Sequence, residues 1–348
     1  MGNALGALGS FEEQKKAFEH ALRIKEDHYG PNHQEVFLTL AGLAGALNNL
    51  GHWAQAKKLF KKVMKWDEKF YGPDHPEVAN DLINLSDIVC NLGDYEQSRV
   101  LIERALRISL THYDSNHLNI AAIFTVYSKI LAALGDYHQA KEYAERGLRI
   151  HECCYGPDHP AVASSLSLLS SIILELGHID QAKEFLERAL QIQESDDGDC
   201  NVQLVEILLP LADTYLALNS LEQAKYNAER ALAILQQNYE PEHFYIADAL
   251  CCLGGVLGKL DPILAKKHLE RALAIHEKHL GVDHPEVATA CFHLATVELT
   301  LQEFELSFIH AKRCYSIRLR VLGEHHDWTQ RAFKLLEAIE DQKNNSLR

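Results

Sequence analysis

Apolar residues recur along this chain at helical spacing, and the pattern breaks at two kinds of point before it starts again. One break is the stretch Tyr71-Gly72-Pro73-Asp74-His75-Pro76-Glu77-Val78. Its Gly-Pro pair ends a helix, Asp74 is a candidate cap for the next helix, and Pro76 suits a first helical position. The other break is a Leu-Gly pair such as Leu92-Gly93, where glycine can end a helix in a left-handed conformation. The pattern therefore predicts repeats, each made of two helices joined by a tight turn.

Both breaks return at a fixed interval. Copies of the longer break begin at residues 29, 71, 113, 155, 239, 280 and 322. The steps are 42 residues, with 84 across a degenerate copy near Asp197 and one step of 41 between 239 and 280. The shorter breaks follow the same period: Leu50-Gly51, Leu92-Gly93, Leu134-Gly135, Leu176-Gly177, Leu218-Asn219, Leu260-Asp261 and Leu301-Gln302. A period of this length predicts stacked helical repeats.

Three columns of small residues repeat with the same period, and small residues allow two helices to cross closely. The first helix of each repeat carries Ala44, Ser86, Ser128, Ser170, Ala212, Gly254 and Ala295. The second carries Ala56, Ser98, Ala140, Ala182, Ala224, Ala265 and Ser307, and then Val63, Ala105, Gly147, Ala189, Ala231, Ala272 and Cys314. Isoleucines at 108, 150, 192, 234, 275 and 317 supply a buried apolar stripe. We expect an all-α fold.

These columns and the Leu-Gly turn resemble the tetratricopeptide repeat (TPR). The 42-residue period and the Tyr/Leu-Gly-Pro-Asp-His-Pro stretch are similar to the kinesin light chain and nephrocystin-3 type. The resemblance implies one right-handed superhelical solenoid over residues 1–348, with a partial repeat at 1–28, seven repeats at about 33–321 and a C-terminal capping helix at about 327–342. Leu8-Gly9 would be the mid-repeat turn of the partial repeat, whose shortened first helix would leave an apolar face exposed. We expect either that this sequence is a fragment of a longer chain or that a partner covers that face.

The resemblance also implies a binding surface, because in such proteins the first helices line a concave groove that holds an extended peptide or a partner helix. The groove positions here form an amide-rich group and an acidic group: Asn48, Asn49, Asn80, Asn84, Asp87 and Asn91, and then Glu206, Asp213 and Asp248. Amides can pair with a peptide backbone, and carboxylates attract basic segments. The alternative is that these are exposed helix residues without a ligand.

One column departs from the kinesin light chain pattern, in which asparagine recurs at the position of Asn84. Here that column reads Gly42, Asn84, Val126, Leu168, Pro210, Cys252 and His293. The departure argues against kinesin-type cargo binding and leaves the predicted scaffold unchanged.

Charge and composition narrow the classes of partner. The net charge is −15, from 34 basic and 49 acidic residues, which argues against nucleic acid because phosphate binding requires a basic face. No stretch is apolar for the ~18 residues of a membrane span, and no signal peptide is visible. The eight cysteines lack a metal-binding spacing. Reduced thiols and a cytoplasmic location are the simplest interpretation.

The most repeated polar feature is one histidine in each long break: His33, His75, His117, His159, His243, His284 and His326. Histidines one repeat apart cannot gather on one metal, so we expect each to tie its loop to a helix end. His276 and His279 share a helical face at a spacing that a transition metal could use, but a structural role is simpler. No phosphate-binding loop, nucleophile elbow or His-Glu-x-x-His helix is present. We expect no enzymatic activity and no cofactor.

The sequence therefore predicts a protein-interaction scaffold. Its partner would be a protein or peptide with basic or apolar segments, bound in the concave groove as a peptide or a helix. The alternative is a regulatory or targeting module of a longer multidomain protein, such as a kinesin-light-chain-like adaptor or a secreted effector, whose catalytic part is absent from this sequence.

Overall fold

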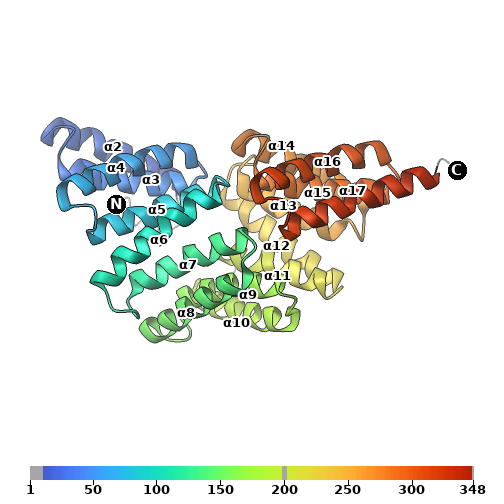
Figure 1. The fold of residues 1–348 in the computed structure, drawn as a ribbon, viewed down its shortest axis with the longest axis horizontal. Helices are drawn as coiled ribbons and strands as arrows, with labels where there is room; N and C mark the ends of the chain where they lie inside the picture. The colour runs from blue at the N-terminus through green and yellow to red at the C-terminus, as the bar shows by residue number, and fades with distance from the viewer. Residues whose placement is uncertain (1–10, 198–201, 347–348) are drawn as a thin grey trace. The chain divides into compact units, whose positions relative to one another are not determined.

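A computed structural model describes residues 11–197 and 202–346, and the chain divides into two compact units, Met1–Ala133 and Leu134–Arg348. The predicted turn at Leu8-Gly9 and the degenerate loop after Asp197 lie outside the described residues. In the first unit the helices are α2 (Phe11–Tyr29), α3 (Gln34–Asn49), α4 (Trp53–Tyr71), α5 (Pro76–Asn91), α6 (Tyr95–His112) and α7 (Leu118–Ala133). Figure 1 shows these helices in blue and blue-green.

The second unit continues with α8 (Tyr137–Tyr155), α9 (Pro160–Glu175), α10 (Ile179–Asp197), a 3₁₀ turn (Val202–Leu204), α11 (Val205–Ala217), α12 (Leu221–Asn238) and α13 (Phe244–Leu257). It ends with α14 (Pro262–Leu280), α15 (Pro285–Thr300), α16 (Phe304–Leu322) and α17 (Asp327–Ser346). Over the described ranges every regular element is helical, and successive helices within a unit pack on each other. The predicted all-α architecture of stacked helix pairs is confirmed.

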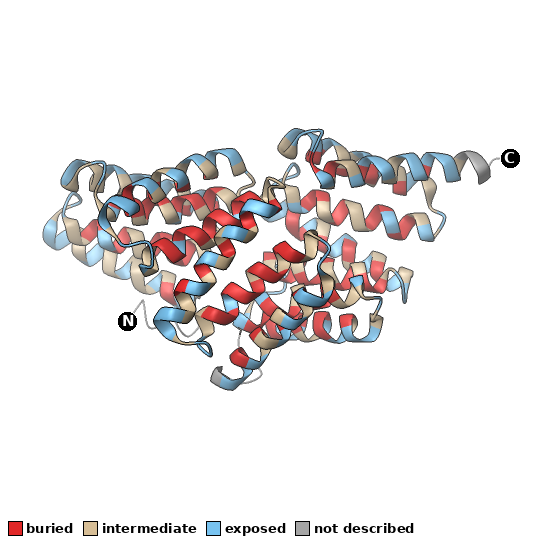
Figure 2. Cartoon of the chain, turned by 60° about the horizontal axis from the view of Figure 1, so that its bottom comes forward, coloured by how far each residue is buried: buried red, intermediate tan, exposed pale blue. Residues whose placement is uncertain are grey.

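The small-residue columns lie where the helices of a pair cross. Ala44, Ser86 and Ala212 on first helices and Ala56, Ala140 and Ala224 on second helices are each 0% exposed. The isoleucine stripe is buried beside them, and Figure 2 shows the buried positions as bands along the helices. Serine in these columns also makes hydrogen bonds: Ser86 Oγ donates to the carbonyl of Ser98 (3.0 Å), and Ser98 Oγ donates to the carbonyl of Ser86 (2.6 Å).

The tight turn within a repeat requires a left-handed residue, as predicted. Gly93 has φ +77°, and where glycine is missing Asn219 and Gln302 take φ +58° and +62°. The repeat that is one residue shorter is the exception, because Asp261 has φ −145° and its side chain caps α14 by accepting from the Leu264 amide. The deletion is thus absorbed in this turn.

The loop histidines cap the helices that follow them. His75 Nδ1 accepts a hydrogen bond from the Glu77 amide (3.2 Å), and the other six loop histidines make the same bond at 3.1–3.3 Å. The structural role predicted for them is confirmed. The prediction that Asp74 caps α5 is wrong: the chain enters the helix at His75, whose extended backbone aims its imidazole at the free amides, and Pro76 follows as the first helical residue.

Two further ties in the loops were not predicted. The tyrosine four residues before a capping histidine stacks on its ring, with centroids 4.6 Å apart for Tyr71 and His75 and 4.4 Å apart for Tyr155 and His159. An arginine on the following second helix, Arg104, pairs with Glu68 (2.8 Å) and donates to the Pro73 carbonyl (2.9 Å). Arg188 and Arg313 repeat this arrangement, so the arginine recurs with the period of the chain.

Candidate partner-binding face

The first helices approach one another from repeat to repeat, which places their free sides on the inner side of each stack. In the second unit α9 contacts α11, α11 contacts α13, α13 contacts α15 and α15 contacts α17. In the first unit α5 contacts α7. The second helices of the described residues show no comparable contacts from repeat to repeat. Repeat stacks use such an inner surface for binding.

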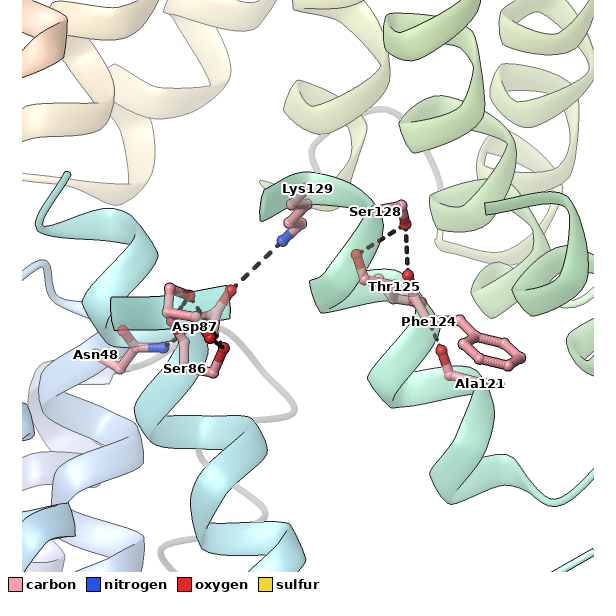
Figure 3. Close-up of polar contacts among 9 residues, drawn as sticks. Asn48, Ser86, Asp87, Ala121, Phe124, Thr125, Ser128 and Lys129 are labelled. Atoms are coloured by element: carbon pink, nitrogen blue, oxygen red, sulfur yellow. Dashed lines mark hydrogen bonds and ion pairs between the residues drawn. The ribbon is translucent and has the colours of Figure 1, made fainter. Parts of the chain in front are cut away.

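In the first unit, a chain of polar side chains crosses the inner face from α3 to α7 (Figure 3). Asn48 Nδ2 donates to Asp87 Oδ2 at 3.4 Å, and Lys129 Nζ lies 3.8 Å from Asp87 Oδ1. The Lys129 side chain remains half exposed. Asn48 Oδ1 is buried and has no hydrogen-bond partner in the structure. Three repeats are thereby linked by one amide, one carboxylate and one ammonium group.

The remaining amides of the first unit lie on the same helices. Asn119 Nδ2 donates to Asn80 Oδ1 at 3.3 Å, which joins α7 to α5. Asn84 is exposed, and its Nδ2 donates to the Asn80 carbonyl of its own helix at 3.0 Å. Asn49 and Asn91 are half-buried at the ends of α3 and α5. The amide-rich group predicted from the sequence is therefore partly engaged with itself, with Asn84 the most accessible member.

Packing beneath this face holds the helices in place. Figure 3 shows the buried Ser86 next to Asp87, and Ser128 next to Lys129. Ser128 Oγ donates to the carbonyls of Phe124 (2.5 Å) and Thr125 (3.1 Å) within α7. Each serine points into the core, and the following residue points to the inner face. One turn of helix thus serves both the core and the face.

The predicted acidic group lies in the second unit, and its members have different surroundings. Asp213 on α11 is accessible to solvent, yet protein encloses its carboxylate on several sides. This desolvation, together with the negative charge of Glu175, raises the pKa of Asp213 to about 6. The Cys252 thiol partly offsets the shift by donating to Asp213 Oδ1 at 3.5 Å.

Asp248 is not a free carboxylate, because it is bound to a buried histidine. Its Oδ1 lies 2.9 Å from Nε2 of His276, a residue that is 0% exposed. Burial alone lowers the pKa of His276, but the hydrogen bond and charge of Asp248, together with Glu286, raise it above its usual value. Sequence spacing placed Asp248 on the inner face but could not reveal this partner, which is 28 residues away.

Glu206, like Asp213, is exposed to solvent. Its side chain is exposed, while its main-chain carbonyl accepts from Ser167 Oγ at 2.5 Å, which ties α9 to α11. The acidic group therefore comprises one exposed carboxylate, one accessible but crowded carboxylate and one that is paired with histidine. Glu175, at the end of α9, adds a further carboxylate to this face of the second unit.

No group of three or more His, Cys, Asp or Glu side chains within residues 11–197 and 202–346 is placed to hold a metal ion. None of the described helices is long and apolar enough to cross a membrane.

Two models of the tetratricopeptide repeat match the sequence. One covers residues 35–111, 82–153 and 119–195, and the other covers residues 1–35 and 263–286. Together they span more than half of the chain. The chain belongs to the tetratricopeptide repeat family. TPR domains are in general protein-binding domains, and the resemblance inferred from the repeat pattern is confirmed.

Several solved structures are similar to the chain at low sequence identity. A Rap protein complexed with Competence and Sporulation Factor matches with a TM-score of 0.71 and 14% identity, over 90% of this chain and 81% of that one. The apo quorum sensor NprR from B. thuringiensis matches with a TM-score of 0.61 and 17% identity, over 88% and 83%. A putative kinesin light chain with nearly identical TPR-like repeats from Podosopora anserina reaches a TM-score of 0.45 and 21% identity, over 59% and 97%. No curated protein sequence matches the chain.

Proposed function

We propose that this TPR protein is a non-enzymatic cytoplasmic scaffold that binds segments of partner proteins along the inner faces of its first helices. The observation that carries the proposal is the chemistry of these faces. Asn84, Glu206 and Asp213 are accessible polar side chains on helices whose opposite sides are closely packed. Side chains that do not stabilise the core are available for a ligand.

The two units are expected to favour different features of a partner. Amides in the first unit suit the main chain of an extended peptide, because an amide both donates and accepts. Carboxylates in the second unit suit lysine and arginine side chains of the partner. The Rap protein complex supports ligand binding by an all-helical fold of this architecture.

The test begins by capturing partners on the full chain and identifying them by mass spectrometry. Binding of a captured partner is then measured at low and high salt for Asn84→Ala, Asp213→Lys and the control Glu184→Lys, which lies exposed on the second helix α10. Asn84→Ala should weaken binding by about 1 kcal/mol at any salt concentration, since it removes a hydrogen bond. Asp213→Lys should weaken binding strongly at low salt and less at high salt, because exposed charges are screened over ~10 Å at 0.1 M.

The control should leave binding unchanged, because its charge reversal is equal but lies on another face. If a captured partner binds all three variants as tightly as the parent chain, the first-helix faces are not the binding surface. Equal losses for Asp213→Lys and Glu184→Lys would indicate a general effect of net charge rather than a site.

A further inference from the structure

The last described helix, α17, begins like a first helix but makes a contact that the other first helices do not. His326 caps it by accepting from the Trp328 amide at 3.1 Å. One turn later Arg331 Nη2 lies 3.1 Å from Glu175 Oε2 at the end of α9, although 156 residues separate the two. Both residues belong to the second unit. Among the first helices of that unit, α9 is the earliest in the chain and α17 is the last, and this ion pair joins them.

A second contact supports the ion pair. A Cβ atom added to Gly135, in the turn before α8, would lie 3.0 Å from Cδ2 and 3.1 Å from Nε2 of His326. Tyr137, at the start of α8, is only 7% exposed, and its hydroxyl is buried without a hydrogen-bond partner in the structure. The equivalent Gly177 in the next repeat has nothing within 4 Å of such a Cβ atom. Of these two turns, therefore, only the one at Gly135 closely approaches another helix.

Arg331 also occupies a position in its helix that is used for the inner face elsewhere. It follows its capping histidine by five residues, as Asn80 follows His75 and Asp248 follows His243. Its guanidinium thus meets a carboxylate of the inner face as the basic side chain of a partner would. Glu175 in turn adds negative charge at Asp213, so the pair lies within the acidic part of this unit.

We propose that the Arg331–Glu175 pair is a latch that joins α17 to α9 across the inner face of the second unit, and that a partner segment rich in arginine opens it by replacing Arg331 on Glu175, while α17 stays packed on α16 through Ala332 and Ile339. The replacement of Arg331 by an arginine of a partner rests on the proposed function, whereas the latch itself does not. Both side chains of the pair are partly exposed, at 53% for Arg331 and 26% for Glu175. Exposed ion pairs contribute little to stability, so the latch is readily exchanged for an equivalent contact.

Zero-length cross-linking tests the latch in the full chain. In the variant Arg331→Lys, a carbodiimide should join the new amine to the Glu175 carboxylate as an amide, and mass spectrometry of the digest should find that link. Lys343 of α17 and Glu305 of α16 form a native pair at 2.6 Å and provide an internal standard. Absence of the 175–331 link while the 305–343 link forms would overturn the latch.

A matched pair of variants tests the contact at the turn. Gly135 and Gly177 have φ +84° and +83°, and Asn219 shows that asparagine is accepted at the equivalent turn. In the Arg331→Lys background, Gly135→Asn should push His326 away and lower the 175–331 yield about threefold or more, because the added atoms overfill a close contact. Gly177→Asn should leave that yield unchanged. Equal yields in the two variants would contradict the proposal.

An acetylated octa-arginine peptide tests the competition with a partner arginine in the same background. Its binding is followed by fluorescence anisotropy, and it should lower the 175–331 yield severalfold while the 305–343 yield stays constant. Loss of both links would indicate plain charge screening and overturn the competition. Binding that is weakened by Asp213→Lys, without a change in the 175–331 link, would also overturn it. Failure of the peptide to bind at all would instead reject the proposed preference of this face for basic segments.

Discussion

The inner faces of the two units differ in how they balance charge, although the same repeat builds both. In the first unit Asp87 has a lysine one repeat further on, at 3.8 Å, and an amide on its other side. At the equivalent position of the second unit, Asp213 has no basic neighbour of this kind and lies near Glu175, and its pKa is raised to about 6. Residues at these positions do not determine the fold, so the repeat permits opposite electrostatic properties on an unchanged scaffold.

The two units also differ in which of their repeats are joined by polar side chains on the inner face. In the first unit these side chains join neighbouring repeats, from Asn48 to Asp87 and from Asp87 to Lys129. In the second unit the Glu175–Arg331 pair joins α9 to α17, which are several repeats apart. Neighbour-to-neighbour pairing stiffens a surface, whereas a pair between distant repeats can open and close it. We therefore expect the first unit to present a fixed face and the second a regulated one.

The largest effect should come from overfilling one unit at a time. Ala105 on α6 and Ala189 on α10 occupy the same column, and both are 0% exposed. Replacing either with phenylalanine should lower the free energy of unfolding by roughly 1–3 kcal/mol or more, because the helices cross too closely to accommodate the ring. Hydrogen exchange should quicken in residues 11–133 for Ala105→Phe and in residues 134–346 for Ala189→Phe. Equal loosening of both units by either change would argue against two compact units.

The second-largest effect should be a pH dependence of the stability of the first unit. Asp67 on α4 and Asp81 on α5 interact with each other, and burial and the neighbouring carboxylate raise the pKa of Asp81 to about 9. A carboxyl group whose pKa is raised on folding stabilises the protein less and less as pH rises from its unfolded pKa of about 4 towards its folded pKa. Asp81→Asn removes this cost and can still donate to Asp67.

The stability advantage of Asp81→Asn should therefore grow between pH 5 and pH 9, by up to about 1.4 kcal/mol per pH unit. This advantage is measured by chemical denaturation at several pH values, with hydrogen exchange of the first unit as the readout. Thr39, at the equivalent position one repeat earlier, provides the neutral control Thr39→Asn, which should show no such trend. A constant difference between the Asp81→Asn variant and the parent chain across this range would contradict the buried acid pair.

Removing a capping histidine should have a smaller effect that is equal in the two units. His75→Ala and His159→Ala should each lower the free energy of unfolding by about 1 kcal/mol, since each loses one cap bond and a stacking partner for tyrosine. His178→Ala, at an exposed turn of the second unit, is the control. Zinc should not raise the melting temperature of the parent chain. A zinc-dependent rise that disappears in His159→Ala would refute the structural role.

The smallest expected effect is the pH dependence of binding to the second unit. Because Asp213 titrates near pH 6, its charge is lost as pH falls, and acetylated octa-arginine should bind more weakly at pH 5 than at pH 7. In Asp213→Asn this difference should shrink to that of the remaining carboxylates, while Asp87→Asn in the first unit should retain the parental profile. Anisotropy titrations measure all three. Matching profiles for parent and Asp213→Asn would show that this carboxylate does not contribute.

The sequence by itself determined the fold, because each repeat is a short segment whose residue pattern recurs at a fixed interval. The 42-residue period, the small columns around Ala189 and the left-handed turn at Gly93 each depend on residues close in the chain or one repeat away. Helix pairing then follows from the need to bury the apolar stripe. The same reasoning placed Asn84 and Asp213 on the first helices, since helical spacing fixes the side of a helix on which a residue lies.

Tertiary structure alone decided what these side chains touch. Whether Asp74 or His75 caps α5 depended on the backbone path of the loop, and both residue types can satisfy a free amide. Asp248 could be assigned to a face, but its histidine comes from the neighbouring helix, 28 residues along the chain. The Glu175–Arg331 pair spans 156 residues and follows from the summed rotation of several repeats, a quantity that no single repeat encodes. Local periodicity therefore specifies the helices and their faces, whereas contacts between distant repeats depend on how small rotations accumulate.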